Sequence, residues 1–245
     1  MNNILKLLLF SVFIFLLLSA CSLKWQKTIQ YGSLQNETFQ EHVGIEVING
    51  LIIVPVVVNG KTYRFLFDSG APLSISDKLQ DQFEYKTISK GHIVDTDKNR
   101  QKIIYVQLDT ISIGDIPFVN QTALVINFEA NPFIACLGLD GIIGSNLMRF
   151  CNWQINYQDS LILLTNSPIE KILDKVVAIP FITDNQYDMM VDLQFGESSI
   201  TKMKIDYGSN GSISLTKGVF NSIKQNGGFG DIFLEKGTAQ AGIVG

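Results

Sequence analysis

Apolar and polar residues alternate along short stretches of this chain, as they do in half-buried β-strands. From about Ile45 onwards, turn-forming pairs such as Asn59-Gly60 and Gly114-Asp115 separate these stretches. The predicted strands cover residues 45–48, 51–58, 62–67, 73–75, 103–108, 110–113, 123–126, 153–157 and 161–164. Helical periodicity is weak and is best at residues 145–150 and 217–225. The pattern therefore predicts an all-β fold rich in antiparallel hairpins.

The first twenty residues follow a different pattern. Lys6 is followed by a run over residues 7–18 that is apolar apart from Ser11, and then by Ser19, Ala20 and Cys21. Such a run is too short for an ordinary membrane-spanning helix and is typical of a signal peptide. Residues 18–21 resemble the lipobox of bacterial lipoproteins, whose cysteine becomes the first mature residue and carries the lipid. We expect a signal peptide over residues 1–20 and a lipid anchor on Cys21; a plain secretory signal and an uncleaved anchor are the alternatives.

One arrangement occurs twice in the chain. An apolar strand leads into an Asp, then one residue, a Gly and a small residue, at positions 68–71 and again at 206–209. A hairpin-like stretch precedes each copy. A repeat of this kind indicates a duplicated lobe. The predicted organisation is a tether over residues 21–44, a first lobe over 45–167 and a second lobe over 168–245.

The repeated turn suits a specific chemistry. A Gly soon after the Asp lets backbone N–H groups approach the carboxylate oxygens. If the turns of Asp68 and Asp206 face each other, the two carboxyl groups share one proton, because they cannot both ionise at close range. The ionised member can then take a proton from a water while the protonated member donates to a carbonyl oxygen. This arrangement favours hydrolysis of an amide bond.

These residues resemble the retropepsin-like and pepsin-like aspartic proteases. Asp68-Ser69-Gly70-Ala71 is similar to the D-[ST]-G-[AS] signature of that family. Residues 140–144, Asp-Gly-Ile-Ile-Gly, followed by Leu147 and by residues 153–157, are similar to its second hallmark, in which two apolar residues and a Gly pack beneath the active-site turn. The resemblance covers residues from about 45 to 165. It implies a closed β-barrel lobe, duplicated, and an aspartic endopeptidase that acts on a peptide or protein substrate and needs no cofactor.

The resemblance assigns the site residues in both copies. The catalytic residues would be Asp68 and Asp206, and the active-site turns would contain Ser69, Gly70, Ala71, Tyr207, Gly208 and Ser209. Residues 94–100 lie where the family has its substrate-covering flap, although a plain surface loop fits them equally well. Tyr207 departs from the family, because it replaces the Ser or Thr whose hydroxyl bonds across the two turns.

The second lobe also looks shortened. Its Gly-Ile-Val-Gly element, residues 242–245, follows Asp206 much sooner than residues 141–144 follow Asp68. We expect an incomplete second lobe, in a sequence that is a fragment of a longer chain. If that lobe is inactive, two copies of Asp68 in a homodimer would supply the carboxylate pair.

Composition and cysteine content narrow the choice of function. The chain of 245 residues is 17% charged with a net charge of -4 and has no basic cluster, which argues against nucleic-acid binding. His42 and His92 are the two histidines, and neither is at metal-ligand spacing from a cysteine, so no metal site is predicted. Outside the cytoplasm Cys136 and Cys151 could form a disulfide; two buried thiols are the open alternative.

Three classes of function fit this sequence. The first is an aspartic peptidase that is anchored to the cell envelope by lipid on its periplasmic or surface side. The second is a catalytically inactive envelope lipoprotein that binds peptides with the same β fold. The third is a structural envelope protein.

Overall fold

The structure is a computed structural model, and we describe residues 28–94, 100–167 and 177–233. Strands dominate this part of the chain, as the sequence predicts. The strands are β1 (Ser33–Leu34), β2 (Gln40–Gly44), β3 (Glu46–Ile48), β4 (Leu51–Val58), β5 (Lys61–Phe67), β6 (Ser74–Ser76), β7 (Thr87–Val94), β8 (Arg100–Ile113), β9 (Ile116–Ile126), β10 (Gly141–Ile143), β11 (Asn152–Asn156), β12 (Leu161–Thr165), β13 (Ile182–Thr183), β14 (Met189–Phe195) and β15 (Ser198–Lys204). The helices are α2 (Asp77–Phe83), η1 (Phe128–Ala130), α3 (Pro132–Ala135), α4 (Ser145–Met148) and α5 (Lys217–Gln225).

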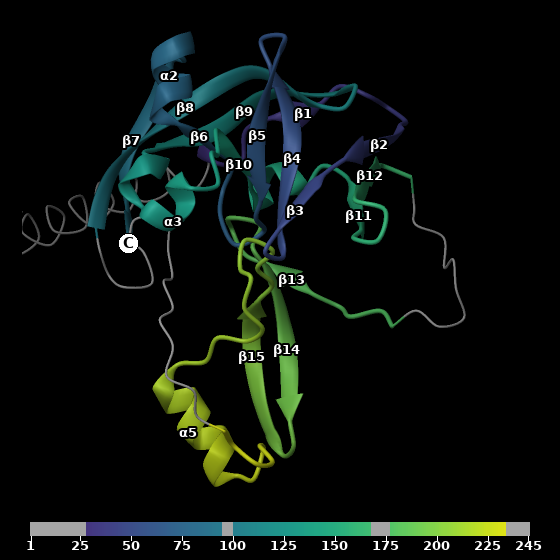
Figure 1. Cartoon of the computed structure of the whole chain (residues 1–245), viewed down its shortest axis with the longest axis vertical. Helices are drawn as coiled ribbons and strands as arrows, with labels where there is room; N and C mark the ends of the chain where they lie inside the picture. The colour runs from purple at the N-terminus through teal and green to yellow at the C-terminus, as the bar shows by residue number, and fades with distance from the viewer. Residues whose placement is uncertain (1–27, 95–99, 168–176, 234–245) are drawn as a thin grey trace, which may run out of the picture.

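One nine-stranded sheet forms the body of the first lobe (Figure 1). Its hydrogen-bonded order runs β1-β9-β6-β10-β5-β4-β8-β7, and β3 pairs with β4. Strand β8 also pairs with β9, so the pairings lead from β4 through β5, β10, β6, β9 and β8 back to β4. The sheet therefore wraps around its own apolar face, and a core can form inside the lobe.

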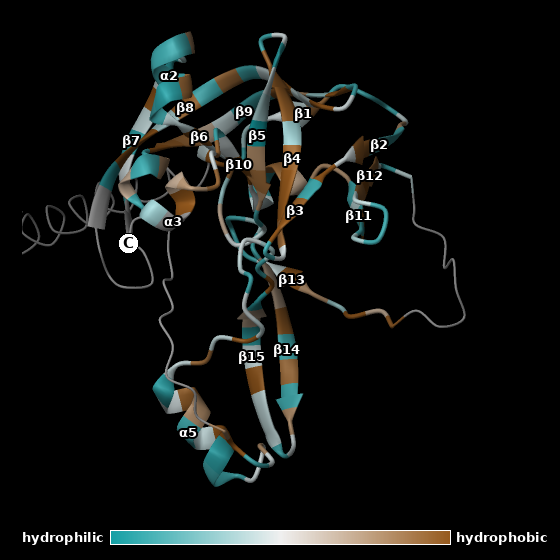
Figure 2. Ribbon diagram, viewed as in Figure 1, coloured by the Kyte–Doolittle hydropathy of each residue, from teal (hydrophilic) through white to brown (hydrophobic). Residues whose placement is uncertain are grey.

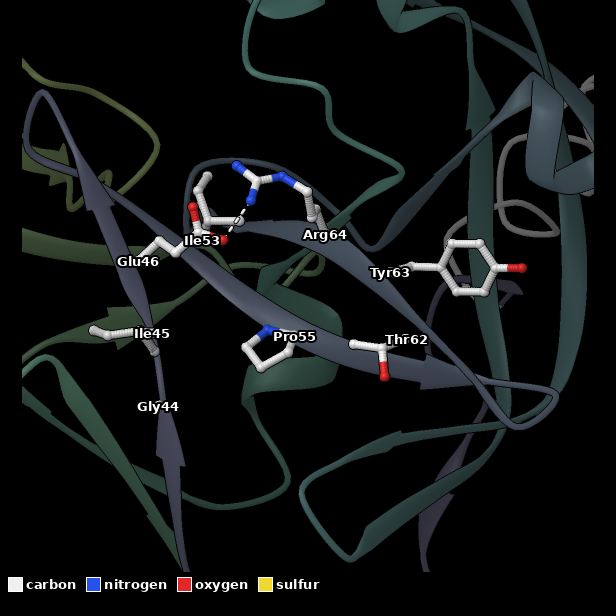
Figure 3. Close-up of a pocket in the computed structure, with 8 residues that line it drawn as sticks. All are labelled: Gly44, Ile45, Glu46, Ile53, Pro55, Thr62, Tyr63 and Arg64. Carbon is white, nitrogen blue, oxygen red and sulfur yellow. Dashed lines mark hydrogen bonds and ion pairs between the residues drawn. The ribbon is translucent and has the colours of Figure 1, made fainter.

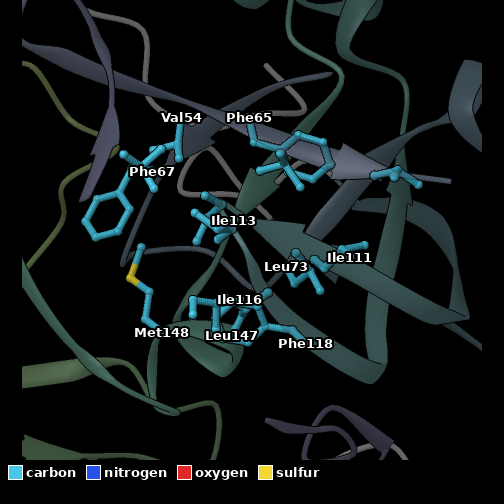
Figure 4. Close-up of a cluster of buried hydrophobic side chains, with 14 of the residues drawn as sticks. Val54, Phe65, Phe67, Leu73, Ile111, Ile113, Ile116, Phe118, Leu147 and Met148 are labelled. Carbon is cyan, nitrogen blue, oxygen red and sulfur yellow. The ribbon is translucent and has the colours of Figure 1, made fainter. Parts of the chain in front are cut away.

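The core consists of the inward-facing residues of these strands. Val54, Phe65, Ile111, Ile113 and Phe118 are almost completely buried, and Figure 4 shows their side chains converging on one another. Hydrophobic residues occupy nearly all of β4 (Figure 2), because both faces of that strand are covered. This packing gives the strand that ends at Asp68 a rigid foundation.

A smaller sheet of order β11-β12-β2 corrects the predicted tether. Residues 21–44 were expected to link the lipid to the lobe, but β2 pairs with β12 and β1 pairs with β9. Ile29 is 1% exposed, and Val43 is buried as well. Residues 28–44 thus belong to the first lobe, because a few apolar side chains and backbone pairing suffice to fix a short strand at the edge of a sheet. Residues 21–27 lie outside the described part of the chain.

The second lobe, over its described residues 177–233, is a three-stranded sheet of order β13-β14-β15 with α5 nearby (Figure 1). Phe220 of α5 stacks on Phe229, which also contacts Phe195 of β14. Ile223 is the buried anchor of the helix. Within its described residues the buried hydrophobic side chains of this lobe are Val191 and Ile223, far fewer than in the first lobe.

Within the described ranges no helix is long and apolar enough to cross a bilayer.

Candidate active site

Asp68 lies directly after β5, at the place where that strand meets β10. Ile142 pairs in parallel with Leu66 and Ile143 with Phe67, and the Asp68 N–H donates to the Ile143 carbonyl at 3.0 Å. The prediction that the aspartate turn lies beside residues 141–144 is therefore confirmed. Those apolar residues are 0–1% exposed, so they form the floor that holds the start of the turn.

The two Asp turns share the same internal geometry. The Gly70 N–H donates to Asp68 Oδ1 at 2.8 Å, and the Gly208 N–H donates to Asp206 Oδ1 at 2.9 Å. Each carboxyl group therefore accepts a hydrogen bond from the residue two positions later in its own turn. The repeat seen in the sequence is thus a repeat of structure at this point.

The two turns also face each other. A β-carbon placed on Gly70 would lie 2.7 Å from the carboxyl carbon of Asp206. A β-carbon placed on Gly208 would likewise lie closer to the Asp68 carboxyl group than van der Waals contact allows. Each glycine therefore leaves the space that the opposite carboxyl group occupies, and the structure brings Asp68 and Asp206 together as the sequence predicts.

One hydroxyl group links the two turns. Ser69 Oγ donates to the Ile205 carbonyl at 2.7 Å and accepts from the Tyr207 N–H at 3.1 Å. The equivalent bonds from residue 207 would need a hydroxyl on its β-carbon, which tyrosine lacks. Its ring instead packs edge to face on Phe67, with 5.7 Å between ring centroids. The crosslink between the turns is therefore one-sided.

The surroundings of the two carboxyl groups differ. Asp68 is 7% exposed, whereas Asp206 is solvent-exposed. Burial first, and then the charge of Asp206, raise the pKa of Asp68 to about 7, against the hydrogen bond from Gly70. Two carboxyl groups that lie side by side share a proton, and the one that burial has removed from water holds it more readily.

The remaining predicted turn residues support this geometry. Ala71 is buried, and its carbonyl accepts the Ser145 N–H at 2.9 Å at the start of α4. Ser209 lies at the exposed end of the second turn, where its N–H donates to the Asp206 carbonyl at 3.4 Å.

Nothing in the sequence singles out Asn146, which is completely buried beside this turn. Its Oδ1 accepts the Leu73 N–H at 2.7 Å, and its Nδ2 donates to the Thr122 carbonyl at 3.1 Å. The side chain therefore satisfies one backbone group just before β6 and one in β9.

Other predicted features have mixed outcomes. Strands β7 and β8 form a hairpin whose last pair is Val94 and Arg100, so the flap region is a hairpin, although its tip at 95–99 lies outside the described residues.

Cys136 is exposed and Cys151 half-buried, and the structure shows no disulfide joining them. Burial raises the pKa of the Cys151 thiol to about 12. Cys21 and residues 242–245 also lie outside the described ranges.

Two features bear on ligand binding outside the aspartate pair. In the described ranges, no group of three or more His, Cys, Asp or Glu residues is placed to hold a metal ion. A hollow of about 310 Å³ lies between β3 and the β4-β5 hairpin, where Arg64 pairs with Glu46 (Figure 3). It is lined by residues of the first lobe other than the two aspartate turns.

Comparison with known proteins agrees with the site. Residues 54–147 match the family model described as aspartyl protease. No curated protein matches the sequence. Among solved structures, a retropepsin-like aspartic protease from Rickettsia conorii is 17% identical, with a TM-score of 0.36 over 55% of this chain and 94% of that chain. The segment that matches the aspartyl protease model contains Asp68 and residues 141–144, the two motifs on which the resemblance to aspartic proteases rests.

Proposed function

We propose that this protein is an aspartic endopeptidase that uses Asp68 and Asp206 as a catalytic pair. The observation that supports this best is the reciprocal fit of each carboxyl group against the glycine of the opposite turn. Two aspartates on equivalent turns have little structural reason to meet, because two neighbouring carboxylates repel each other. Their juxtaposition is useful when they share a proton for chemistry.

In the proposed mechanism Asp68 begins protonated and Asp206 ionised. Asp206 takes a proton from a water, whose oxygen attacks the carbonyl carbon of the scissile peptide bond while Asp68 donates its proton to the carbonyl oxygen. The resulting tetrahedral diol collapses when the amide nitrogen accepts a proton from Asp206, the C–N bond breaks, and Asp68 regains its proton from a hydroxyl. The buried position of Asp68 supports its role as the acid.

One chain supplies both carboxyl groups in this proposal. Ser69 already has both of its cross-turn partners in residues 205 and 207 of the same molecule. Arg149, directly after α4, adds a hydrogen bond from Nη1 to the Tyr187 hydroxyl at 2.8 Å. These contacts support an active site between the lobes of one chain over one built from two first lobes.

Hydrolysis of a peptide library tests the proposal. The full-length protein should cleave peptides between about pH 3 and 7, the range in which a carboxyl pair holds a single proton. A pepstatin-like inhibitor, which places a hydroxyl between the two carboxyl groups, should block cleavage. Absence of cleavage by the intact protein across this range would contradict the peptidase function.

The second candidate is a peptide-binding envelope lipoprotein with an inactive site. It is favoured by Tyr207, which leaves the crosslink one-sided, and by the exposure of Asp206. Saturable peptide binding without turnover would support this function. The same peptide library, measured by binding and by cleavage, separates the two candidates.

We further propose that the mature protein is attached to the cell envelope through a lipid on Cys21. The support is the sequence of residues 18–21 directly after the apolar run. Cys21→Ala should move the protein from the membrane fraction to the soluble fraction, and metabolic labelling with a fatty acid should be lost. Cys136→Ala is the control and should leave both unchanged. A Cys21→Ala protein that stays membrane-bound with its leader attached would contradict lipid anchoring.

A further inference from the structure

A charged pair of the second lobe reaches the active-site turn of the first. Lys204 is the last residue of β15, two positions before Asp206. Its ammonium forms an ion pair with Asp188, which precedes β14. The same Nζ donates a hydrogen bond to the Gly70 carbonyl at 3.0 Å. Both backbone polar groups of Gly70 are therefore hydrogen-bonded, the carbonyl to Lys204 and the N–H to Asp68.

Asp188 is an unusual partner for a half-exposed lysine. Its side chain is 7% exposed, against 38% for Lys204, so the carboxylate has given up most of its hydration. Burial raises the pKa of Asp188, while Lys204 and the Ser145 side chain counteract that increase. A buried carboxylate is costly without such partners. The ammonium is consequently fixed at one place beside Gly70.

The charged groups around this pair come from both lobes. Asp206 and Lys204 act on Asp68, the first raising and the second lowering its pKa. Asp184 faces Asp188 from the same loop and raises its pKa. Arg149, directly after α4, donates a hydrogen bond to Tyr187, which is next to Asp188 in the chain. Lys204 is the positive group that acts on Asp68 directly.

We propose that Lys204 is a positioning residue of the aspartate pair, anchored by Asp188, which fixes the Gly70 carbonyl and places one positive charge beside Asp68. Only the expected effect on the pH range of activity rests on the proposed peptidase function. The ammonium favours the ionised form of Asp68 and so sets the pH range of activity towards acid. Its removal should shift that range towards higher pH. Removal of Asp188, which frees the ammonium from its place beside Gly70, should shift the range the same way by a smaller amount.

The test compares Lys204→Met, Lys204→Arg, Asp188→Asn and the double variant Lys204→Met/Asp188→Asn. Lys204→Met should move the basic limb of the pH profile of kcat/KM, which reports the proton on Asp68, up by about half a unit to one unit, since the charge is partly screened by solvent. Asp188→Asn should move this limb up by less, because the lysine remains but is no longer fixed, and the double variant should match Lys204→Met. Lys204→Arg should retain the wild-type profile.

The matched control is Lys61→Met, which removes an exposed charge at the far end of β5. Seven extended residues separate it from Asp68, roughly 23 Å and well beyond the screening length of about 8 Å at physiological salt. Its pH profile should be unchanged. Thermal unfolding of each variant shows whether it is folded. If Lys204→Met does not fold, Asp188→Asn is the variant that tests the inference.

A second measurement separates this inference from the peptidase function. The ¹³C resonance of the Asp68 carboxyl group, assigned with Asp68→Asn, gives its apparent pKa without any substrate. Upward shifts in Lys204→Met and, to a smaller extent, in Asp188→Asn would support the inference even if the protein cleaves nothing. Cleavage by the wild type, with no shift in Lys204→Met or a downward shift in Asp188→Asn, would overturn the inference and leave the peptidase function intact. Absence of both cleavage and shifts would overturn both.

Discussion

Asp68→Asn and Asp206→Asn should each lower kcat for peptide hydrolysis by about 10³-fold or more. Neither an amide at position 68 nor one at position 206 can exchange a proton with water or with a peptide carbonyl, and a lost general acid or base commonly costs about 10² to 10⁴. Asn fills nearly the same space as Asp, so the turns should keep their form. The measurement is the single-turnover rate on a peptide that the wild type cleaves, with thermal unfolding as the check on folding.

The control for this pair is Asp81→Asn, which makes the same chemical change on the exposed side of α2. It should retain the wild-type rate. An inactive Asp68→Asn beside an active Asp206→Asn would place the site in a homodimer of first lobes. Full activity in both variants would contradict any role for the aspartate pair.

Gly144→Ala should be the most destabilising single-methyl change beneath the active-site turn. A β-carbon there would overlap the backbone of Ala71, Pro72 and Leu73, which cannot yield as a side-chain end can. The backbone of Gly144 is extended, with φ -103° and ψ 173°, so the effect is one of space and not of conformation. We expect a loss of about 3 kcal/mol in the free energy of unfolding, measured by urea denaturation.

Gly144→Ala should also impair catalysis, because the displaced segment contains the Ala71 carbonyl that accepts the Ser145 N–H. Gly218→Ala is the matched control. No atom lies within 4 Å of the added methyl group, and alanine favours a helix by about 1 kcal/mol over glycine. Equal stability of the two variants would contradict the close packing of residue 144 on the turn.

The sequence predicted the strands of the first lobe best where apolar residues form a short continuous run. Residues 51–58 and 161–164 match β4 and β12 closely, and residues 217–225 match α5. The two strands predicted at 103–108 and 110–113 are one long strand, β8, because Asp109 lies at an exposed position without interrupting the pairing. Alternation marks the face of a strand, and a polar residue on the outer face does not end it.

The elements that were missed have little apolar signal. Within β2 the buried hydrophobic residue is Val43, with Phe39 and Ile45 at the two ends of the strand, and β2 is fixed by its pairing with β12. Strand β7 likewise gains its place from β8. Edge strands depend on a partner that lies far away in the sequence, and local patterns cannot reveal it.

The aspartate turns could be predicted because a strand, an Asp and a Gly are neighbours in the sequence. The pair of Lys204 and Asp188 could not. Its position depends on the β14-β15 hairpin, which has a register irregularity between Val191 and Leu193, and on the turn held by Asp184 Oδ1. A lysine and an aspartate sixteen positions apart carry no local pattern that would distinguish them from surface charges.

The one-sided crosslink made by Ser69 has a thermodynamic consequence for how the lobes assemble. Two first lobes facing each other would each supply a serine, which adds two hydrogen bonds worth about 1 kcal/mol each, or roughly a thirtyfold preference. The second lobe, however, is on the same chain and meets Asp68 at an effective concentration of about 1 mM. At about 1 μM protein that advantage is on the order of a thousandfold, which exceeds the roughly thirtyfold preference that the missing hydrogen bonds would give. Pairing within one chain therefore prevails in dilute solution, and exchange between chains becomes competitive only at protein concentrations of roughly 30 μM and above.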